Sequence, residues 1–320
     1  MTTETLTLPL TIAERLDDKG DIMRLTLSDP TGAPLPAVTA GAHIDVLVAT
    51  DSETMWRQYS LAGDPADRAV WQLGILKEPA SRGGSVALHD IARKGAELRI
   101  TGPRNHFGLV EADKTYLYGG GIGVTPMLAM AHELHAKGAP FELHYCTRSA
   151  DRTAFDDVLS TAPFADSIHL HHDDADTKFS AEALPDAAPG THLYICGPEG
   201  FMSWLIGEAE ARGHATNHIH REYFSADVDI TGDTFEVEAR ASGLTVTVGE
   251  GESIVTALAR VGVSVEVKCE EGICGTCLTD VIEGEPDHRD HFLTDDEKAD
   301  NSEMCLCCSR ANSARLVLDI

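Results

Sequence analysis

Residues 269–277 read CEEGICGTC, and a second group of thiols follows at residues 304–308, which read MCLCC. The first stretch spaces Cys269, Cys274 and Cys277 as C-x4-C-x2-C. This spacing with a distant fourth cysteine is the plant-type pattern for a [2Fe–2S] cluster, whose two irons take four soft thiolate ligands. The sequence therefore predicts an iron–sulfur centre near the end of the chain.

Gly272 and Gly275 support this prediction, because a residue without a Cβ atom lets the backbone curl close to the inorganic core. The alternatives are buried free thiols and a four-cysteine zinc site, which often uses paired Cys-x-x-Cys motifs. Two such pairs are present, Cys274 with Cys277 and Cys305 with Cys308. A zinc site leaves Cys269 and the glycine loop unexplained, so the cluster is favoured. Spacing alone leaves three candidates for the fourth ligand, which are Cys305, Cys307 and Cys308.

The composition of the 320 residues limits the class of protein. A net charge of −27 and a pI near 4.7 argue against binding to nucleic acid or to an anionic membrane surface. The N-terminus has neither the basic region nor the apolar core of a signal peptide, and no apolar run of about 18 residues predicts a membrane span. We therefore expect a cytoplasmic protein of two or three domains, in which the eight cysteines are thiols or ligands.

The first hundred or so residues predict a small antiparallel barrel, because short apolar alternations are separated by turn residues. The expected strands include residues 6–14, 22–29, 43–48, 57–61 and 71–76. In the strand RQYSL at 57–61, Arg57 and Tyr59 point to one face and offer a guanidinium for phosphate and a ring for stacking. The alternative is an ordinary edge strand with a surface arginine.

Residues 82–85, RGGS, open a predicted helix over residues 86–92. The backbone N–H groups of Gly83 and Gly84, together with the hydroxyl of Ser85, form a typical anion site at the start of a helix. A phosphate group is therefore expected at this turn.

From about residue 111, strands and helices alternate, which predicts a parallel-sheet α/β domain. A strand at 115–118 runs into GGGIGVTPM at 119–127, and a helix follows, with Thr125 as its N-cap and Pro126 in its first turn. Strand, glycine loop and helix N-terminus together are the arrangement that binds pyrophosphate, although these glycines do not fit G-x-G-x-x-G. The alternative is a tight turn with only a structural role.

Two later strands of this domain end in candidate site residues. The strand at 141–146 leads to Arg148, which lies where a nucleotide ribose or 2′-phosphate is bound, or is a solvated charge. The strand at 191–195 leads to CGPEGFM at 196–202. Residues 169–174, HLHHDD, invite a metal hypothesis, but we expect these side chains at a strand end to be solvated.

The last domain is expected to be rich in β-structure with one helix. Residues 225–233 are polar and predict a linker. A hairpin, a helix and two further strands are expected at residues 235–248, 253–261, 279–283 and 316–318. Thr294 with Glu297 predicts a capping box at the start of a short helix.

Five motifs together resemble the phthalate dioxygenase reductase family, within the ferredoxin–NADP reductase superfamily. They are the RxYS strand, the glycine–serine turn, the GGxGxTPM loop, the CGPxxxM turn and the C-terminal cysteine pattern. The resemblance covers nearly the whole chain and implies a multi-domain α/β and β protein. It implies an antiparallel flavin-binding β-barrel at 1–108, a parallel-sheet α/β nucleotide-binding domain at 109–226, a linker at 227–234 and a β-grasp-like plant-type ferredoxin domain at 235–320.

The resemblance also implies which residues form the sites. FMN would be bound by Arg57, Tyr59, Ser60, Lys77, Gly83, Gly84 and Ser85. NADH would be bound by Gly119, Gly120, Gly121, Gly123, Thr125, Arg148, Cys196, Gly197 and Pro198. The residues implied at the reacting rings are Thr125, Cys196 and Phe224. Of these, Phe224 would cover the flavin ring, and Tyr223 is the alternative for this role. The cluster ligands would be Cys269, Cys274, Cys277 and Cys307, because the family's last ligand lies just before an x-Ser-Arg-Ala run; Cys308 stays an alternative.

The order of these parts implies the reductase component of a Rieske-type oxygenase or O-demethylase system, active as a monomer. Hydride would pass from NADH to FMN, and single electrons would then pass through the [2Fe–2S] cluster to the oxygenase. NADH and FMN, over NADPH and FAD, are family inferences, and Arg148 keeps the first of these open. The alternatives are a stand-alone NAD(P)H-dependent reductase of flavins, ferric chelates or quinones, and a non-catalytic redox-sensing binding protein.

Overall fold

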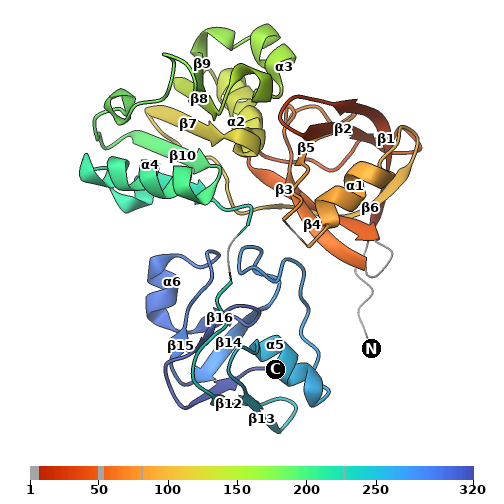
Figure 1. Cartoon of the computed structure of the whole chain (residues 1–320), viewed down its shortest axis with the longest axis vertical. Helices are drawn as coiled ribbons and strands as arrows, with labels where there is room; N and C mark the ends of the chain where they lie inside the picture. The colour runs from red at the N-terminus through yellow and green to blue at the C-terminus, as the bar shows by residue number, and fades with distance from the viewer. Residues whose placement is uncertain (1–6, 50–53, 81, 226–227) are drawn as a thin grey trace. The chain divides into compact units, whose positions relative to one another are not determined.

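The computed structural model describes residues 7–49, 54–80, 82–225 and 228–320. The chain divides into two compact units, Met1–Glu222 and Tyr223–Ile320, whose helices and strands are labelled in Figure 1. Each unit is described by itself below. Within the described residues, no helix combines the length and the apolar character that crossing a bilayer requires.

The first part of unit 1 is the expected antiparallel barrel. Its strands are β1 (Leu8–Asp17), β2 (Ile22–Ser28), β3 (Ala42–Ala49), β4 (Thr54–Ser60), β5 (Trp71–Leu76) and β6 (Glu97–Asn105). They form one sheet in the order β4-β3-β6-β1-β2-β5 with every neighbouring pair antiparallel. Leu61, just after β4, bridges Leu73 on β5, so the two edge strands meet and the barrel nearly closes. Helix α1 (Gly84–Ile91) follows β5.

The alternation read from the sequence has a direct structural cause. Side chains of a strand point alternately to its two sides, so every second apolar residue enters the barrel core. Leu10 and Ile12 of β1 and Leu25 and Leu27 of β2 are all buried in this core. The predicted strand at residues 22–29 is therefore confirmed as β2, one residue shorter at its end.

The second part of unit 1 is the expected parallel α/β domain. Its elements are β7 (Lys114–Gly120), α2 (Val124–Lys137), β8 (Phe141–Thr147), α3 (Asp156–Thr161), β9 (Ile168–His172), β10 (Thr191–Cys196), α4 (Glu199–Ala211) and β11 (Ile219–Glu222). The sheet order is β11-β10-β7-β8-β9, with all pairs parallel. The chain moves one way from β7 to β8 and the opposite way from β10 to β11, so right-handed crossovers place α2 and α4 on opposite faces (Figure 1). A switch point therefore lies between the carboxyl ends of β7 and β10, where such sheets bind ligands.

The start of α2 differs from the sequence prediction. Gly119 and Gly120 finish β7, Gly121–Gly123 forms a single 3-10 turn, and α2 begins at Val124. Thr125 is not the N-cap, because the turn runs directly into the helix and leaves this residue in the first helical turn. Its Oγ1 instead donates to the carbonyl oxygen of Ile122 at 3.0 Å.

Unit 2 contains a mixed five-stranded sheet crossed by one helix, which is the expected β-grasp-like arrangement. Its elements are β12 (Phe235–Ala239), β13 (Leu244–Val248), α5 (Ile254–Arg260), β14 (Leu278–Glu283), β15 (Pro286–Asp287), α6 (Asp295–Asp300), β16 (Glu303–Cys305), β17 (Arg310–Ala311) and β18 (Arg315–Leu318). The order is β13-β12-β18-β14-β16, and only β12 and β18 run parallel. The predicted capping box is confirmed, because Thr294 and Glu297 exchange hydrogen bonds at the start of α6.

The segment predicted as a linker is attached to unit 2. Arg310 is only 2% exposed and donates to the carbonyl oxygens of Ile230, Gly232 and Asp233. Arg289 donates to the carbonyl of Thr231 at 2.7 Å. These bonds hold the described part of the segment against the last domain. The domain limits at residues 108, 226 and 234 stay predictions.

Candidate flavin, nucleotide and cluster sites

Arg57 of β4 lies against the first turn of α1. A Cβ atom added to Gly84 would lie 2.6 Å from Arg57 Nε, so only a glycine leaves room for the guanidinium. Gly83, just before the helix, has a φ of +84°, which glycine adopts without strain. The cation and the N–H groups at the helix start together form a site for an anion such as phosphate. Ser85 Oγ accepts a bond from the amide of Glu78 at 3.1 Å, which fixes the turn to the end of β5.

Two further residues of the RxYS strand lie beside this anion site. The hydroxyl of Tyr59 is buried and has no hydrogen-bond partner within the described parts of the chain, and burial raises its pKa. A buried polar atom without a partner is rare in proteins, and a bound ligand would satisfy it. Ser60 is buried and its Oγ lies 3.2 Å from Glu222 Oε2, to which it donates. The strand therefore fits a bound flavin.

Lys77 is less well placed than Arg57 for a role in phosphate binding. Its Nζ lies 3.8 Å from Asp90 Oδ1, and 42% of its side chain is exposed. An exposed ion pair of this kind is worth little free energy. Its contact with phosphate stays a prediction.

The turns after β7 and β10 touch each other at the switch point. A Cβ atom on Gly123 would lie 2.2 Å from the carbonyl oxygen of Cys196. One on Gly197 would lie 2.9 Å from Gly120 Cα. The two backbones pass at a distance that only glycine permits, which leaves their N–H groups accessible to a ligand. Gly121 has a φ of +54°, so this turn also needs glycine for its conformation.

Neighbouring residues hold these turns in place. A Cβ atom on Gly119 would lie 2.8 Å from Val124 Cα, and one on Gly120 would meet the ring of Phe201 at 2.8 Å. Pro198 is the N-cap residue of α4, so the N-termini of α2 and α4 both begin at this edge of the sheet. Two helix N-termini and close-packed glycines are the groups that bind a dinucleotide pyrophosphate.

Glu222 is a site residue that sequence analysis missed. It ends β11 and pairs in register with Cys196, which ends β10. Burial raises the pKa of the Glu222 carboxyl to about 8. Burial and the nearby Glu222 carboxylate raise the pKa of the fully buried Cys196 thiol. A small polar group between the barrel and the switch point is therefore formed by Ser60, Cys196 and Glu222. The only sequence signal for Glu222 was its position at the end of a strand.

Thr125 and Arg148 have different surroundings. Thr125 is 1% exposed, and a Cβ atom on Gly74 of β5 would lie 2.8 Å from its methyl carbon. This residue packs the start of α2 against the barrel, and its hydroxyl is already bonded to Ile122. Arg148 follows β8 with an exposed side chain, at the carboxyl edge of the sheet where it was expected. Their contacts with a nucleotide stay predictions.

Phe224 and Tyr223 belong to unit 2. The Tyr223 ring stacks on His291, with ring centroids 4.3 Å apart and planes 30° apart. Phe224 is half-buried. A cover over the flavin formed by Phe224 stays a prediction.

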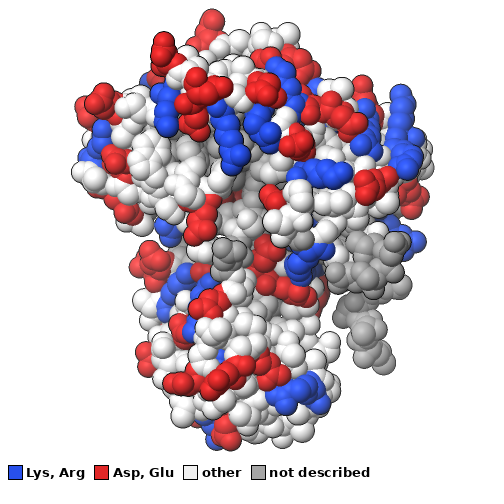
Figure 2. Space-filling view, viewed as in Figure 1, with Lys and Arg blue, Asp and Glu red and all other residues white. Residues whose placement is uncertain are grey.

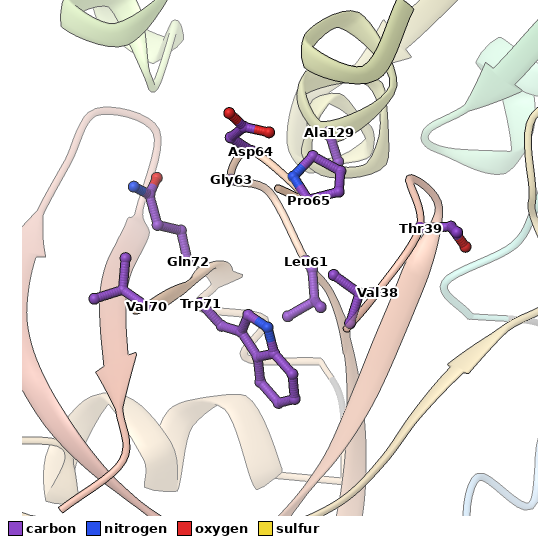
Figure 3. Close-up of a pocket in the computed structure, with 10 residues that line it drawn as sticks. All are labelled: Val38, Thr39, Leu61, Gly63, Asp64, Pro65, Val70, Trp71, Gln72 and Ala129. Carbon is purple, nitrogen blue, oxygen red and sulfur yellow. The ribbon is translucent and has the colours of Figure 1, made fainter. Parts of the chain in front are cut away.

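A pocket in unit 1 lies away from the predicted residues. Figure 3 shows Trp71, Leu61 and Val38 on one side and Pro65 and Ala129 on the other. It is a gap between barrel strands and α2, and none of the predicted site residues lines it. It therefore adds nothing to the flavin or nucleotide sites.

The thiols of the cluster motif gather in unit 2. Neighbouring thiols of Cys274 and Cys307 lower the pKa of Cys269. Those of Cys305 and Cys307 lower the pKa of Cys277. All five cysteines are buried. The same contacts, together with burial, raise the pKa of Cys274, Cys305 and Cys307. Close, buried sulfur atoms are the donor set that iron and sulfide require, so the residues fit a [2Fe–2S] cluster.

The three cysteines considered for the fourth ligand differ in their contacts. Cys307 hydrogen bonds with both Cys269 and Cys277. The thiol of Cys305 contacts that of Cys277. The Cys308 sulfur lies 3.8 Å from the Cys305 carbonyl oxygen and from Ser309 Oγ. Cys307 therefore contacts both ends of the C-x4-C-x2-C loop.

The two loop glycines have the expected freedom and a further steric role. Gly272 and Gly275 have φ values of +68° and +67°. A Cβ atom on Gly272 would lie 2.5 Å from Cys308 Sγ, and one on Gly275 would lie 2.3 Å from the Phe292 ring. The loop is therefore kept tight by its protein neighbours. The amide of Glu271 donates to Cys269 Sγ at 3.4 Å, a bond of the kind that tunes cluster potentials.

Comparison with known proteins agrees with this arrangement. Residues 237–312 match the model of the 2Fe-2S iron-sulfur cluster binding domain. The chain is 47% identical to the vanillate O-demethylase oxidoreductase of Pseudomonas sp. (strain HR199 / DSM 7063), over 94% of this chain and 96% of that one. It is 39% identical to the carnitine monooxygenase reductase subunit of Escherichia coli (strain K12), over 93% and 94% of the two chains.

A solved structure extends the similarity to the whole fold. Phthalate dioxygenase reductase, described as a modular structure for electron transfer from pyridine nucleotides to [2Fe–2S], is 36% identical and aligns with a TM-score of 0.72. The alignment covers 98% of each chain. Identity and coverage at this level hold across the barrel, the α/β domain and the cluster domain together. The chain therefore belongs to the phthalate dioxygenase reductase family of iron–sulfur flavoprotein oxidoreductases.

Proposed function

We propose that this protein is the reductase component of a Rieske-type oxygenase or O-demethylase system, with NADH, FMN and a [2Fe–2S] cluster as its redox groups. The main support for the proposal is that the RxYS strand and the CGPxxxM turn lie close together in unit 1. Ser60 of the flavin strand bonds to Glu222 at 3.2 Å, and Glu222 lies in register with Cys196 of the nicotinamide turn. A flavin held by the first motif and a nicotinamide held by the second would therefore be neighbours.

The barrel residues bind and orient the flavin. Arg57 and the N–H groups at the start of α1 neutralise a phosphate, and the buried hydroxyl of Tyr59 gains a partner when the ligand is bound. Arg57 and the start of α1 form one anion site, which suits the single phosphate of FMN. When bound, the flavin converts a two-electron donor into a source of single electrons.

The switch-point residues bind and orient NADH. The glycine turns after β7 and β10 admit the pyrophosphate, and Cys196 and Glu222 lie where β10 and β11 end. Because burial raises the pKa of the Glu222 carboxyl to about 8, this group is neutral at pH 7 and does not repel an anionic cofactor. The chain's own task is to place two rings and exclude water.

The cluster residues are proposed to be Cys269, Cys274, Cys277 and Cys307. Support for the fourth comes from its hydrogen bonds with Cys269 and Cys277. We further propose that the protein works as a monomer in the cytoplasm, where a reducing environment keeps these thiols available. The proposed partner is an oxygenase component, which is in keeping with the names of two relatives, a vanillate O-demethylase oxidoreductase and a carnitine monooxygenase reductase subunit.

The visible spectrum tests the redox groups directly. We expect flavin absorbance with a broad [2Fe–2S] band, both bleached by NADH. Mass spectrometry of the released flavin should give FMN. A colourless protein that contains zinc would contradict the proposal.

Turnover with purified oxygenases tests the partner. The oxygenase components of vanillate and carnitine systems are the first to try, since both relatives align over nearly the whole chain. We expect NADH-dependent product formation with one of these classes that greatly exceeds the rate with ferric chelates or free flavin. Fast ferric or flavin reduction with no oxygenase turnover would favour a stand-alone reductase.

A further inference from the structure

A group of histidines and a glutamate lies on β8 and β9, apart from the residues of the proposed redox path. Glu142 and His144 are two positions apart on β8 and so point to one face, and His169 of β9 pairs in register with His144. Glu142 Oε2 lies 3.4 Å from His144 Nε2 and 3.6 Å from His169 Nε2. The three ligand atoms all lie within 4.8 Å of one another.

Hydrogen bonds fix which nitrogen of His144 carries its proton. His171 Nδ1 lies 2.9 Å from the carbonyl oxygen of Thr177, which can only accept, so this nitrogen is protonated. The Nε2 of a neutral His171 is then an acceptor, and His144 Nδ1 donates to it at 3.0 Å. The remaining nitrogen of His144, Nε2, therefore presents a lone pair.

That lone pair faces another acceptor. His144 is 7% exposed by its side chain, and its Nε2 is buried with no hydrogen-bond partner within the described residues. The nearest charged atom opposite it is a carboxylate oxygen of Glu142. Two acceptors that face each other in a buried place are unfavourable unless a cation lies between them. The contacts of the second nitrogen are also those of a metal ligand, because a ligating histidine donates its other N–H to a neighbouring group.

We propose that Glu142 Oε2, His144 Nε2 and His169 Nε2 bind a divalent transition-metal ion of the zinc class. Two imidazoles and a carboxylate are a common ligand set for zinc, which completes its tetrahedron with a solvent molecule. His169, with 44% of its side chain exposed, gives the ion access from solvent. Lys114 Nζ holds the other carboxylate oxygen, Oε1, at 2.6 Å and so orients Oε2 toward the histidines. The ion would tie the edge strand β9 to β8.

A second histidine group in the same domain provides a control. His192 of β10 bonds to His220 of β11 through Nδ1 and Nε2 at 2.9 Å, and the His218 ring lies 4.3 Å from His192. The potential ligand atoms of this group do not come together with a carboxylate in the way those of Glu142, His144 and His169 do. It should therefore bind a metal ion much more weakly.

Calorimetric titration of the holoprotein with zinc chloride, after treatment with a chelating resin, tests the proposal. We expect one site in the wild type. Glu142→Gln and His169→Gln should each weaken it at least tenfold, and His218→Gln should leave it unchanged. Both test positions are partly exposed, so the variants should fold, which circular dichroism checks. Zinc should also raise the melting temperature of the wild type more than that of either test variant.

X-ray absorption at the zinc edge separates this site from the cysteines. The proposed ligands predict nitrogen and oxygen scatterers at about 2.0–2.1 Å with none of the sulfur scattering seen at about 2.3 Å for thiolates. The [2Fe–2S] absorbance should stay constant during the titration. Sulfur scattering, loss of cluster absorbance, test variants that bind zinc as tightly as the wild type, or loss of binding only in His218→Gln would each overturn the proposal.

Discussion

Cys307 and Cys308 are adjacent in the chain and their thiols contact each other, but their further contacts differ. Cys307 hydrogen bonds with Cys269 and Cys277, whereas the Cys308 sulfur lies beside the Cys305 carbonyl and Ser309. We therefore expect Cys307→Ser to lose the [2Fe–2S] absorbance and the matching iron and sulfide, and Cys308→Ser to keep them. The measurement is visible and electron paramagnetic resonance spectroscopy of the NADH-reduced variants.

Flavin content is the internal control for this pair of variants. The flavin residues lie in unit 1 and the cysteines in unit 2, so both variants should keep FMN and its reduction by NADH. A Cys308→Ser protein without a cluster, beside a Cys307→Ser protein with one, would assign the ligand to Cys308. Loss of flavin in either would point to general misfolding.

The raised pKa of Glu222 predicts how stability changes with pH. In the folded chain this carboxyl keeps its proton up to about pH 8, whereas in the unfolded chain it loses the proton near the ordinary value of 4.5. Between these values the folded state binds one more proton, so stability falls by about 1.4 kcal/mol per pH unit as pH rises. Glu222→Gln removes this contribution. Its melting temperature should match the wild type near pH 4.5 and exceed it increasingly up to pH 8.

Single residues also show where sequence analysis succeeds and where it fails. The cysteine spacing predicted a cluster loop because the three candidate ligands lie within nine consecutive residues, 269–277. Glu222 was missed, as was the grouping of Glu142 and His144 with His169, and the side chains of residues 169–174 were expected to be solvated. Both depend on the register of parallel strands, which pairs Cys196 with Glu222 and His144 with His169. Register is set by the whole sheet, and no local pattern contains it.

At the scale of elements, the contact between the turns after β7 and β10 yields a prediction. A Cβ atom on Gly123 would lie 2.2 Å from the carbonyl oxygen of Cys196, which is backbone and cannot move independently. Gly123→Ala should therefore separate the two turns, weaken NADH binding at least tenfold and lower the melting temperature. Stopped-flow reduction of the flavin at varied NADH concentration measures the first effect.

Gly207 is the matched control for this substitution. It lies inside α4, and an added Cβ atom would meet no other atom within 4 Å. Gly207→Ala should leave NADH binding unchanged and should stabilise the protein slightly, because alanine favours a helix over glycine by about 0.5–1 kcal/mol. Equal NADH affinity in Gly123→Ala and Gly207→Ala would show that the turns do not position the nucleotide.

Helices and strands could be predicted where the local sequence pattern agrees with the surroundings of the element in the fold. Alternating apolar residues identified five of the six barrel strands to within a few residues, because one side of each strand is buried, but β6 was not predicted. The glycine run was predicted to be a loop from Gly119 onward, but β7 continues through Gly120. Pairing with β8 and β10 on both sides provides the hydrogen bonds that hold these two glycines in the strand. A central strand can thus include residues that have a low strand propensity.

At the scale of the whole molecule, charge is the property that bears on the partner. Asp and Glu outnumber Lys and Arg by 52 to 25 in the chain, and by 21 to 7 in residues 223–320. The unit that contains the cluster cysteines is therefore strongly acidic. Figure 2 shows acidic side chains across the face in view, with basic side chains interspersed among them. Such a surface suits docking on a basic patch of the oxygenase and steers its approach.

Ionic strength should therefore affect the rate of oxygenase reduction and the rate of NADH association differently. Attraction to a basic oxygenase surface is screened as the Debye length falls from about 30 Å at 0.01 M to about 8 Å at 0.15 M salt. We expect the second-order rate constant for oxygenase reduction to fall at least tenfold over this range. NADH is an anion that approaches an acidic protein, so its association should be unchanged or faster at high salt. A parallel fall in both rates would mean that salt perturbs the protein itself, and a flat oxygenase rate would mean that docking depends on apolar contacts instead of charge.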